Sequence, residues 1–450
     1  MDHFHFRDGE LYVEDLAVAG IVERHGSPLY IYSARTFEHH VAAMRAAFAA
    51  LDPLLCFSVK SCANLSILKL LVEQGCGLDV VSGGELYRAL QAGADAGKIV
   101  FAGVGKSREE LADAIKAGVF LFNVESEAEL ARLDALACAA GKRIKAAIRV
   151  NPDVADPGTH HKTATGGRQT KFGVPIAAAS ALFTPGRYPS VDVVGVHVHL
   201  GSPILSAQTY LAAIDKVEQF VDQLEADGAP VNWINIGGGF PAPYYADAEA
   251  EAAPADTLAA MGRAICARLA PLQARCKRFI IEPGRAISAN AGILVTRVEY
   301  VKQGWDRKIV VADAGMNVLL RPALYGAGHV IWPVRAGRFS GHWSLAARAA
   351  ATPAERVDVV GPICETGDYF ALDRPLPALQ SGELLALFSC GAYGMSMANQ
   401  YNSRGRPAEV LVENGRARLV RRRESHADLV AHELCALDEV DGFIVPMAPR

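Results

Sequence analysis

The sequence predicts a (β/α)8 barrel joined to a second domain built mainly of β-strands. Two observations support this fold class. Between residues 54 and 282, eight short apolar runs alternate with segments of helical period. From about residue 290 the pattern changes to strand-like runs separated by turn residues, with few helical segments. Open, doubly wound sheets also alternate strands and helices, but a count of eight favours the closed barrel.

The eight expected barrel strands are apolar runs that end near polar residues. Several of the helical segments between them begin at a capping residue, such as Asn64 or Ser107, and end on glycine, such as Gly75 or Gly118. The expected strands cover residues 54–60, 78–82, 99–103, 120–124, 145–150, 191–200, 232–236 and 278–282.

The second domain is predicted from runs such as "GILVTRVEYVKQ" (292–303), "RVDVVGPIC" (356–364) and "AEVLVENGRARLV" (408–420). The N-terminal pieces "GELYVED" and "SPLYIYS" are also strand-like, and we expect them to join this second sheet. We therefore divide the chain into a barrel domain at 30–288 and a β domain, a sandwich or barrel, formed by 1–29 plus 289–450.

Composition excludes several classes of partner. A net charge of −4 over 450 residues gives no electrostatic reason to expect nucleic acid or an anionic membrane. Nine scattered cysteines with no C-x-x-C pair indicate a reducing compartment and no zinc or other metal site. The charged N-terminus lacks the apolar core of a signal peptide, and no apolar run approaches about 18 residues. We expect a soluble, cytoplasmic protein.

Chemistry-bearing residues gather at the ends of the predicted strands, where barrel enzymes place their sites. They are Lys60, His199 and Ser202 in "HVHLGS", the glycines of "GGGF" (237–240), and Glu282 and Arg285 in "EPGR". Taken singly, the glycines serve a tight turn as often as an anion site. Glu282 alone is explained by a buried ion pair, and His199 alone by a satisfied core histidine. Their convergence on one face favours a site.

This set of groups matches the needs of pyridoxal 5′-phosphate. The amine of Lys60 can bond covalently to the aldehyde of the cofactor. Backbone N–H groups of the glycine run, with Ser202 and Arg285, suit the phosphate. A carboxylate such as Glu282 keeps the ring nitrogen protonated, and an imidazole such as His199 can stack on the ring.

The motifs that carry these residues resemble those of a known family. "FSVKSCAN" (57–64), "SGGEL" (82–86), "HLGS", "GGGFP" and "EPGR" occur in the order found in fold-type III pyridoxal phosphate decarboxylases. "DAGMNVLLRPALYGAGH" (313–329), "GPICETGD" (361–368) and "GAYGMSMANQYNSRGRPAEVLV" (391–412) closely resemble the diaminopimelate decarboxylases. The resemblance covers roughly residues 5–435.

The resemblance implies a homodimer with active sites at the subunit interface, and a role for each residue. Catalytic roles fall to Lys60, which holds the cofactor, His199, Glu282 and Cys364. The cofactor would also contact Ser202, Gly238, Gly239, Arg285 and Tyr393. Substrate contacts would come from Arg285, Arg321, Tyr325, Glu365 and Tyr393. Cys364 and Glu365 would reach into the site of the partner subunit.

Charge matching supports the substrate assignment, because meso-diaminopimelate carries a carboxylate and an ammonium at each end. Arg285 and Arg321 offer forked donors to the distal carboxylate, Tyr325 adds a hydrogen bond, and Glu365 meets the distal ammonium. The implied reaction is decarboxylation to L-lysine and carbon dioxide, the last step of lysine biosynthesis, with Cys364 or Lys60 returning the proton.

Three alternatives remain open from the sequence. A decarboxylase of ornithine, lysine, arginine or a carboxylated polyamine precursor would leave Arg321 without a partner. An amino-acid racemase would share Lys60 and the barrel, but is expected to place an arginine, not Glu282, at the ring nitrogen. A non-catalytic pyridoxal phosphate carrier would consist of the barrel alone.

Overall fold

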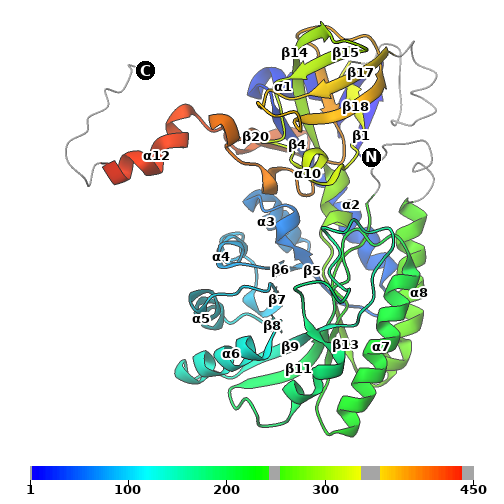
Figure 1. Ribbon diagram of the computed structural model, residues 1–450, viewed down its shortest axis with the longest axis vertical. Helices are drawn as coiled ribbons and strands as arrows, with labels where there is room; N and C mark the ends of the chain where they lie inside the picture. The colour runs from blue at the N-terminus through cyan, green and yellow to red at the C-terminus, as the bar shows by residue number, and fades with distance from the viewer. Residues whose placement is uncertain (1–2, 243–253, 336–354, 438–450) are drawn as a thin grey trace.

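The computed structural model describes residues 3–242, 254–335 and 355–437. The barrel and its helices occupy one half of the elongated molecule, and the β domain occupies the other (Figure 1). Within the described ranges, no helix combines the length and apolar character that crossing a membrane requires.

Eight parallel strands form a closed barrel, as the sequence predicts. Hydrogen bonds link them in the order β9-β11-β12-β13-β5-β6-β7-β8, and β8 pairs back with β9. The short strand β10 (Val174–Pro175) adds to the side of β9. The barrel strands are β5 (Leu54–Ser58), β6 (Gly77–Val80), β7 (Ile99–Phe101), β8 (Leu121–Val124), β9 (Ile144–Asn151), β11 (Val191–His197), β12 (Trp233–Asn235) and β13 (Arg278–Ile281).

Capping residues fix where the helices on the outside of the barrel begin. The side chains of Asn64, Ser82, Ser107 and Ser126 each accept a backbone N–H from the first turn of the helix that follows. Each such cap contributes about 0.5–2 kcal/mol. The helices are α2 (Ala34–Ala47), α3 (Leu65–Glu73), α4 (Gly83–Gln91), α5 (Arg108–Ala117), α6 (Glu127–Ala139), α7 (Ala207–Ala226), α8 (Pro254–Ala274) and the short α9 (Arg285–Ser288).

The inside of the barrel is layered, apolar below and polar above. Cys56, Val100, Leu121, Ala147 and Ile280, from five different strands, form a small buried cluster separate from the main core. Because side chains alternate along a strand, the residue two positions further on points the same way. That residue is polar on most of these strands. The polar layer therefore lies at the C-terminal mouth, where the chain continues into the loops.

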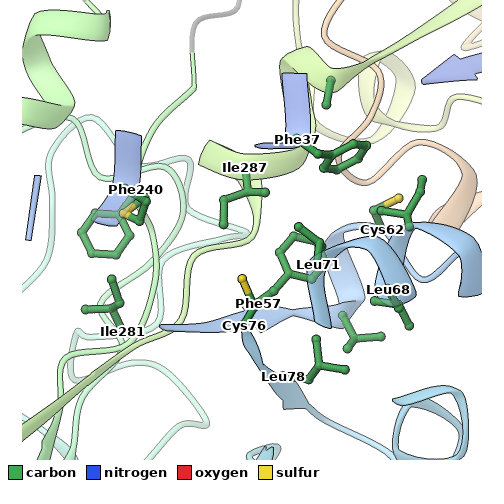
Figure 2. Packing of buried hydrophobic residues seen from close by; sticks show 14 of the residues in the cluster. Phe37, Phe57, Cys62, Leu68, Leu71, Cys76, Leu78, Phe240, Ile281 and Ile287 are labelled. Atoms are coloured by element: carbon green, nitrogen blue, oxygen red, sulfur yellow. The ribbon is translucent and has the colours of Figure 1, made fainter. Parts of the chain in front are cut away.

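The main core runs from the space between the barrel strands and their helices into the β domain. Figure 2 shows Phe57 of β5 and Leu78 of β6 gathered with Leu68 and Leu71 of α3, all of them fully buried. Parallel strands covered on both faces are apolar on both faces, which is why they read as near-continuous apolar runs.

The β domain is organised around β14, which is twelve residues long. Its first half pairs with β4 and β19, and after an irregularity between Val298 and Tyr300 its second half pairs with β15. The strands are β4 (Leu29–Ser33), β14 (Gly292–Gln303), β15 (Lys308–Ala312), β16 (Ile331–Pro333), β17 (Glu355–Val360), β18 (Tyr369–Leu376), β19 (Leu384–Leu387), β20 (Ala408–Glu413) and β21 (Arg416–Arg421). The α-helices described outside the barrel are α1 (Val18–His25), α10 (Arg321–Tyr325) and α12 (His426–Leu437).

The two N-terminal strand predictions have different outcomes. "SPLYIYS" forms β4, which joins the second sheet between β14 and β20. "GELYVED" instead pairs locally: β1 (Phe4–Arg7), β2 (Glu10–Val13) and β3 (Leu16–Ala17) make a separate three-stranded sheet. The turn at Asp8 and Gly9, both with positive φ, favours this hairpin. The division of the chain at residue 30 stays a prediction. Strand β4, which spans this boundary, pairs with β14 and β20 of the β domain.

Candidate active site

Lys60 lies in the single turn Val59–Ser61 that follows β5, two residues beyond the observed end of the strand. Its Nζ donates to Asp79 Oδ2 at 2.6 Å, and the Ser58 hydroxyl donates to the same oxygen at 2.8 Å. Burial lowers the pKa of Lys60, but the charges of Asp79, Tyr393 and Glu282 outweigh this and raise it above its ordinary value. The amine is therefore held as an ammonium, with buried Asp79 as the nearest base.

Glu282 directly follows β13 and is almost fully buried. Its Oε1 accepts from Asn123 Nδ2 at 3.0 Å and from Asn235 Nδ2 at 2.6 Å, and His197 Nε2 lies 3.4 Å from its Oε2. Burial raises the pKa of Glu282, but His197, Lys60 and Asn235 lower it further, so the net shift is downward. The carboxylate is thus held ionised at the centre of the barrel mouth.

His199 stands just beyond β11, with its ring against the glycine run. Its Nδ1 accepts from the backbone N–H of Gly238 at 3.1 Å. Burial, with the charges of Arg149 and Lys60, lowers the pKa of His199 well below its usual range. A neutral, half-buried, flat ring suits stacking on an aromatic cofactor.

The glycine run is closely packed, and side chains do not fit there. A Cβ on Gly238 would lie 2.1 Å from the Glu282 carbonyl oxygen. A Cβ on Gly239, whose φ is +99°, would lie 2.4 Å from the Gly201 carbonyl oxygen. The guanidinium of Arg285 reaches the same region, where its Nε donates to Ser202 Oγ at 3.1 Å. The mouth therefore has a backbone-lined cradle beside one cation and one hydroxyl.

Tyr393 joins the β domain to this cradle. Its backbone N–H donates to the Ser61 carbonyl at 2.8 Å, next to Lys60, and its ring centroid lies 4.9 Å from the Arg285 guanidinium carbon. A tyrosine with φ of +55° is in an uncommon backbone conformation, of the kind that clusters at functional sites. A cavity of about 550 Å³ opens beside Lys60 and Tyr393, between the two domains.

Arg321 begins α10 in the β domain and is buried, with 7% of its surface exposed. Its Nη1 lies 3.1 Å from His329 Nε2, and His329 Nδ1 lies 2.9 Å from the Phe388 carbonyl oxygen. Because Arg321 can only donate, His329 accepts at Nε2 and donates from Nδ1, which fixes it as the neutral tautomer. Burial and the charge of Arg321 lower the pKa of His329 to about 3.

This buried histidine makes stability depend on acid. Between about pH 6.5 and pH 3, His329 is protonated in the unfolded chain but stays neutral in the folded protein. The free energy of unfolding therefore falls as the pH drops through that window. We expect His329 to account for a loss of about 2 kcal/mol in unfolding free energy between pH 7 and pH 5. Urea unfolding at both pH values should show a smaller loss for His329→Gln, and an unaltered loss for the exposed control His426→Gln. An equal loss in wild type and His329→Gln would contradict this expectation.

Tyr325, at the other end of α10, meets the loop that follows β9. The His160 and Tyr325 rings touch edge to face with centroids 5.8 Å apart, and Lys162 Nζ donates to the Leu324 carbonyl at 3.1 Å. The loop over residues 156–172 thus extends from the barrel to the β domain beside α10.

Cys364 and Glu365 are exposed on the 361–368 loop, and no described hydrogen bond or ion pair joins them to the groups around Lys60. Besides backbone hydrogen bonds within the loop, this tip is hydrogen-bonded to Tyr401 and Asn402. The structure thus brings together Lys60, His199, Ser202, Gly238, Gly239, Glu282, Arg285 and Tyr393, and places Cys364 and Glu365 on an outward-facing surface.

Sequence reasoning missed the polar groups that hold the site from within. Asp79, Asn123 and Asn235 bind Lys60 and Glu282, and Arg149 pairs with buried Glu125 at 2.5 Å. A signal was present, because each interrupts an apolar strand, as in "GLDV", "LFNV" and "WINI". A polar residue that follows an inward-facing apolar residue by two positions is the pattern to seek.

Comparisons with known proteins agree with this geometry. Residues 34–289 match a family model described as pyridoxal-dependent decarboxylase, pyridoxal binding domain. Diaminopimelate decarboxylase of Aquifex aeolicus is 42% identical over 434 residues, which cover 96% of this chain and 97% of the relative. The chain belongs to the diaminopimelate decarboxylase family.

Two solved structures from the diaminopimelate decarboxylase family extend the likeness to the fold. The enzyme of Helicobacter pylori, complexed with L-lysine, is 35% identical with a TM-score of 0.84, covering 93% of this chain and 99% of the other. That of M. jannaschii, in co-complex with L-lysine, is 35% identical with a TM-score of 0.87, covering 99% and 98%. These members confirm a barrel plus a mainly β second domain.

The groups at the barrel mouth fit pyridoxal phosphate, the cofactor of this family. Lys60 supplies the amine, Glu282 an ionised carboxylate, and His199 a neutral ring. The glycine backbone at Gly238 and Gly239 packs beside Gly201, next to Ser202 and Arg285, and glycine backbone beside a hydroxyl and a cation is suited to a phosphate. The individual contacts of these residues with the cofactor stay predictions.

Proposed function

We propose that the protein decarboxylates meso-2,6-diaminopimelate to L-lysine and carbon dioxide with pyridoxal phosphate, the last step of lysine biosynthesis. The names of its near-full-length relatives support the substrate. The observation that best supports a decarboxylase is the Glu282 carboxylate. Asn123 and Asn235 hold it in the polar layer at the barrel mouth, the end of the barrel where Lys60 lies. An ionised carboxylate there favours decarboxylation over racemisation, for which an arginine is expected.

When bound, pyridoxal phosphate supplies an electron sink conjugated to the α-carbon of the substrate. Lys60 must first lose a proton to act as a nucleophile, and Asp79 Oδ2, at 2.6 Å, is placed to accept it. Glu282 stays ionised and so favours a proton on the nitrogen facing it. His199, neutral and half-buried, offers a flat ring to one face of the cofactor site. After carbon dioxide leaves, Lys60 Nζ, or Cys364 Sγ reaching across from the second subunit, would return a proton to the α-carbon.

The distal end of the substrate needs a cation and an anion. Buried Arg321, oriented by His329, suits the distal carboxylate, and Tyr325 lies on the same short helix. Glu365 suits the distal ammonium. Ornithine, lysine and arginine lack the distal carboxylate and so lose the charge-assisted hydrogen bonds that Arg321 would make to it, which selects against them.

Carbon dioxide release tests this proposal. We expect release from meso-diaminopimelate and not from L-ornithine, L-lysine or L-arginine. Arg321→Ala should raise KM for diaminopimelate by about 10- to 100-fold, because it removes charge-assisted hydrogen bonds to the unreacting end of the substrate. The exposed control Arg335→Ala, which contacts Glu10, should leave KM unchanged. Activity confined to a monocarboxylate, or unaffected by Arg321→Ala, would sink the substrate assignment.

We also propose a homodimer with shared sites and a cytoplasmic location. Support for the dimer comes from the outward-facing Cys364 and Glu365, and from α12, which extends from the body of the molecule (Figure 1) and exposes Val430 and Leu434. A monomer mass of 47.9 kDa makes sedimentation decisive, since the dimer has twice that mass. All nine cysteines lie in the described ranges and are free, as suits a reducing compartment.

A further inference from the structure

We propose that Tyr401 and Asn402 are positioning residues that hold the tip of the 361–368 loop, with Tyr401 orienting Glu365 and Asn402 orienting Cys364. The inference rests on the proposed function, in which Glu365 binds the distal ammonium and Cys364 supplies a proton. Two independent contacts carry it, one to each residue of the tip.

Each tip residue receives its own hydrogen bond. The Tyr401 hydroxyl donates to Glu365 Oε1, and Asn402 Oδ1 accepts the backbone N–H of Cys364 at 3.0 Å. Cys364, Glu365 and Asn402 are exposed, and 46% of the Tyr401 surface is exposed. The tip is therefore not held by burial. Backbone hydrogen bonds within the loop shape its turn, from Glu365 N to the Ile363 carbonyl at 2.8 Å and from Asp368 N to the Glu365 carbonyl at 3.0 Å, and the bonds to Tyr401 and Asn402 tie it to a second segment.

The base of the loop is fixed by other means. Buried Asp368 accepts the backbone N–H groups of Ile363 and Met316, both at 2.6 Å. A Cβ on Gly361 would lie 2.5 Å from Asp368 Oδ2, so the chain passes directly against this carboxylate. The base of the loop is thus held by Asp368. The tip, in contrast, contacts the segment that contains Tyr401 and Asn402.

The segment that contacts the tip, residues 399–402, has a defined backbone conformation. Its backbone is tied at one end, where Asn399 N donates to the Asn317 carbonyl at 2.8 Å and Asn399 Oδ1 accepts from Tyr401 N at 3.0 Å. Asn402 has φ of +56°, a left-handed conformation that asparagine tolerates better than most residues. This turn presents two successive side chains to the same loop.

The contact to Glu365 has a chemical consequence. A carboxylate has two oxygens, and the Tyr401 hydroxyl occupies one, which leaves Glu365 Oε2 to accept from an ammonium. Glu365 raises the pKa of Tyr401 in return, so the hydroxyl remains a donor at neutral pH.

The two contacts should affect different kinetic constants. The distal ammonium undergoes no change during the reaction, so the Glu365 contact acts equally on ground state and transition state and is seen in KM. The Cys364 thiol acts on the reacting carbon, so its displacement is seen in kcat. A merely structural defect would lower kcat and raise KM together, or would destabilise the protein.

Three variants and two matched controls separate these effects in the pyridoxal phosphate-loaded enzyme. Tyr401→Phe should raise KM for meso-diaminopimelate about three- to tenfold and change kcat less than about twofold, because the hydrogen bond is charge-assisted but exposed. Asn402→Gly, which keeps the left-handed backbone and loses the acceptor, should lower kcat with little change in KM. Asn402→Asp, which restores an acceptor oxygen, should recover most of kcat.

The controls make the same chemical changes elsewhere. Tyr300→Phe alters an exposed tyrosine on β14, and Asn414→Gly alters a left-handed asparagine in the turn between β20 and β21. Both should behave as wild type. Wild-type constants for Tyr401→Phe and Asn402→Gly would overturn the inference while leaving the proposed function intact. So would loss of the dimer by sedimentation, which would assign these residues to assembly. Failure of wild type to release carbon dioxide would instead overturn the proposed function.

Discussion

Replacing Lys60 with alanine should lower kcat for carbon dioxide release by about 10⁴-fold or more, the scale of losses seen when a catalytic nucleophile is removed. The alanine variant loses the covalent anchor for the cofactor and the amine that can return a proton. It also leaves Asp79 buried without its cation, since Asp79 Oδ2 accepts from Lys60 Nζ at 2.6 Å. Single-turnover release of carbon dioxide measures the chemical step without interference from product release.

A second variant separates charge from nucleophilicity. Lys60→Arg keeps a cation opposite Asp79, but a guanidinium stays protonated and does not attack an aldehyde. We expect it to be as inactive as Lys60→Ala and to unfold closer to wild type. Borohydride reduction followed by peptide mass analysis should place the cofactor on the Lys60 peptide of wild type alone. Cofactor recovered on a different lysine, or substantial activity in both variants, would refute the assignment.

Glu282→Gln should lower kcat by about 10²- to 10³-fold, the range found when one group that stabilises developing charge is removed. The amide has the shape of the carboxylate but no charge, so it no longer favours a proton on a nitrogen facing it. The hydrogen bonds from Asn123 and Asn235 to Oε1, at 3.0 and 2.6 Å, hold the side chain in place and can be accepted by the glutamine oxygen as well. The measurement is kcat across a pH series with saturating substrate.

Stability provides the control for this variant. Burying an ionised carboxylate costs free energy, and its neutral isostere is often equally or more stable. We therefore expect Glu282→Gln to unfold in urea at the wild-type midpoint or above it, while kcat falls. A fall in both quantities would mean that Glu282 acts mainly in the fold, and the role at the ring nitrogen would be wrong.

The sequence predicted the barrel because its strands and helices have different periods. The structure has the predicted helix cap at Asn64, and it places Lys60 in the turn after β5, at the barrel mouth. The inward-facing polar layer of the barrel was not predicted from the sequence. Strands buried on both faces lack the alternation that separates inside from outside, so Asn123 and Asn235 looked like isolated polar residues in apolar runs.

Other residues of the candidate site depended on resemblance, not on pattern. Cys364 and Glu365 lie on an exposed loop whose composition gives no sign of catalysis. Their hydrogen bonds to Tyr401 and Asn402 span 36 and 38 positions in the chain, and no local periodicity encodes such a pairing. The N-terminal hairpin was missed for the opposite reason, because the Asp8–Gly9 turn lets "GELYVED" pair with its immediate neighbour.

The position of β4 bears on the order in which the molecule is made. This strand lies between β14 and β20, where Leu29 is paired with Val295 on one side and with Ala408 on the other. During synthesis β4 therefore leaves the ribosome long before either neighbour exists, while the barrel residues that follow can pair among themselves. Contacts between such distant positions form late and slowly. Until then β4 has two unpaired edges, so the nascent chain depends on shielding of this strand until residue 412 has emerged.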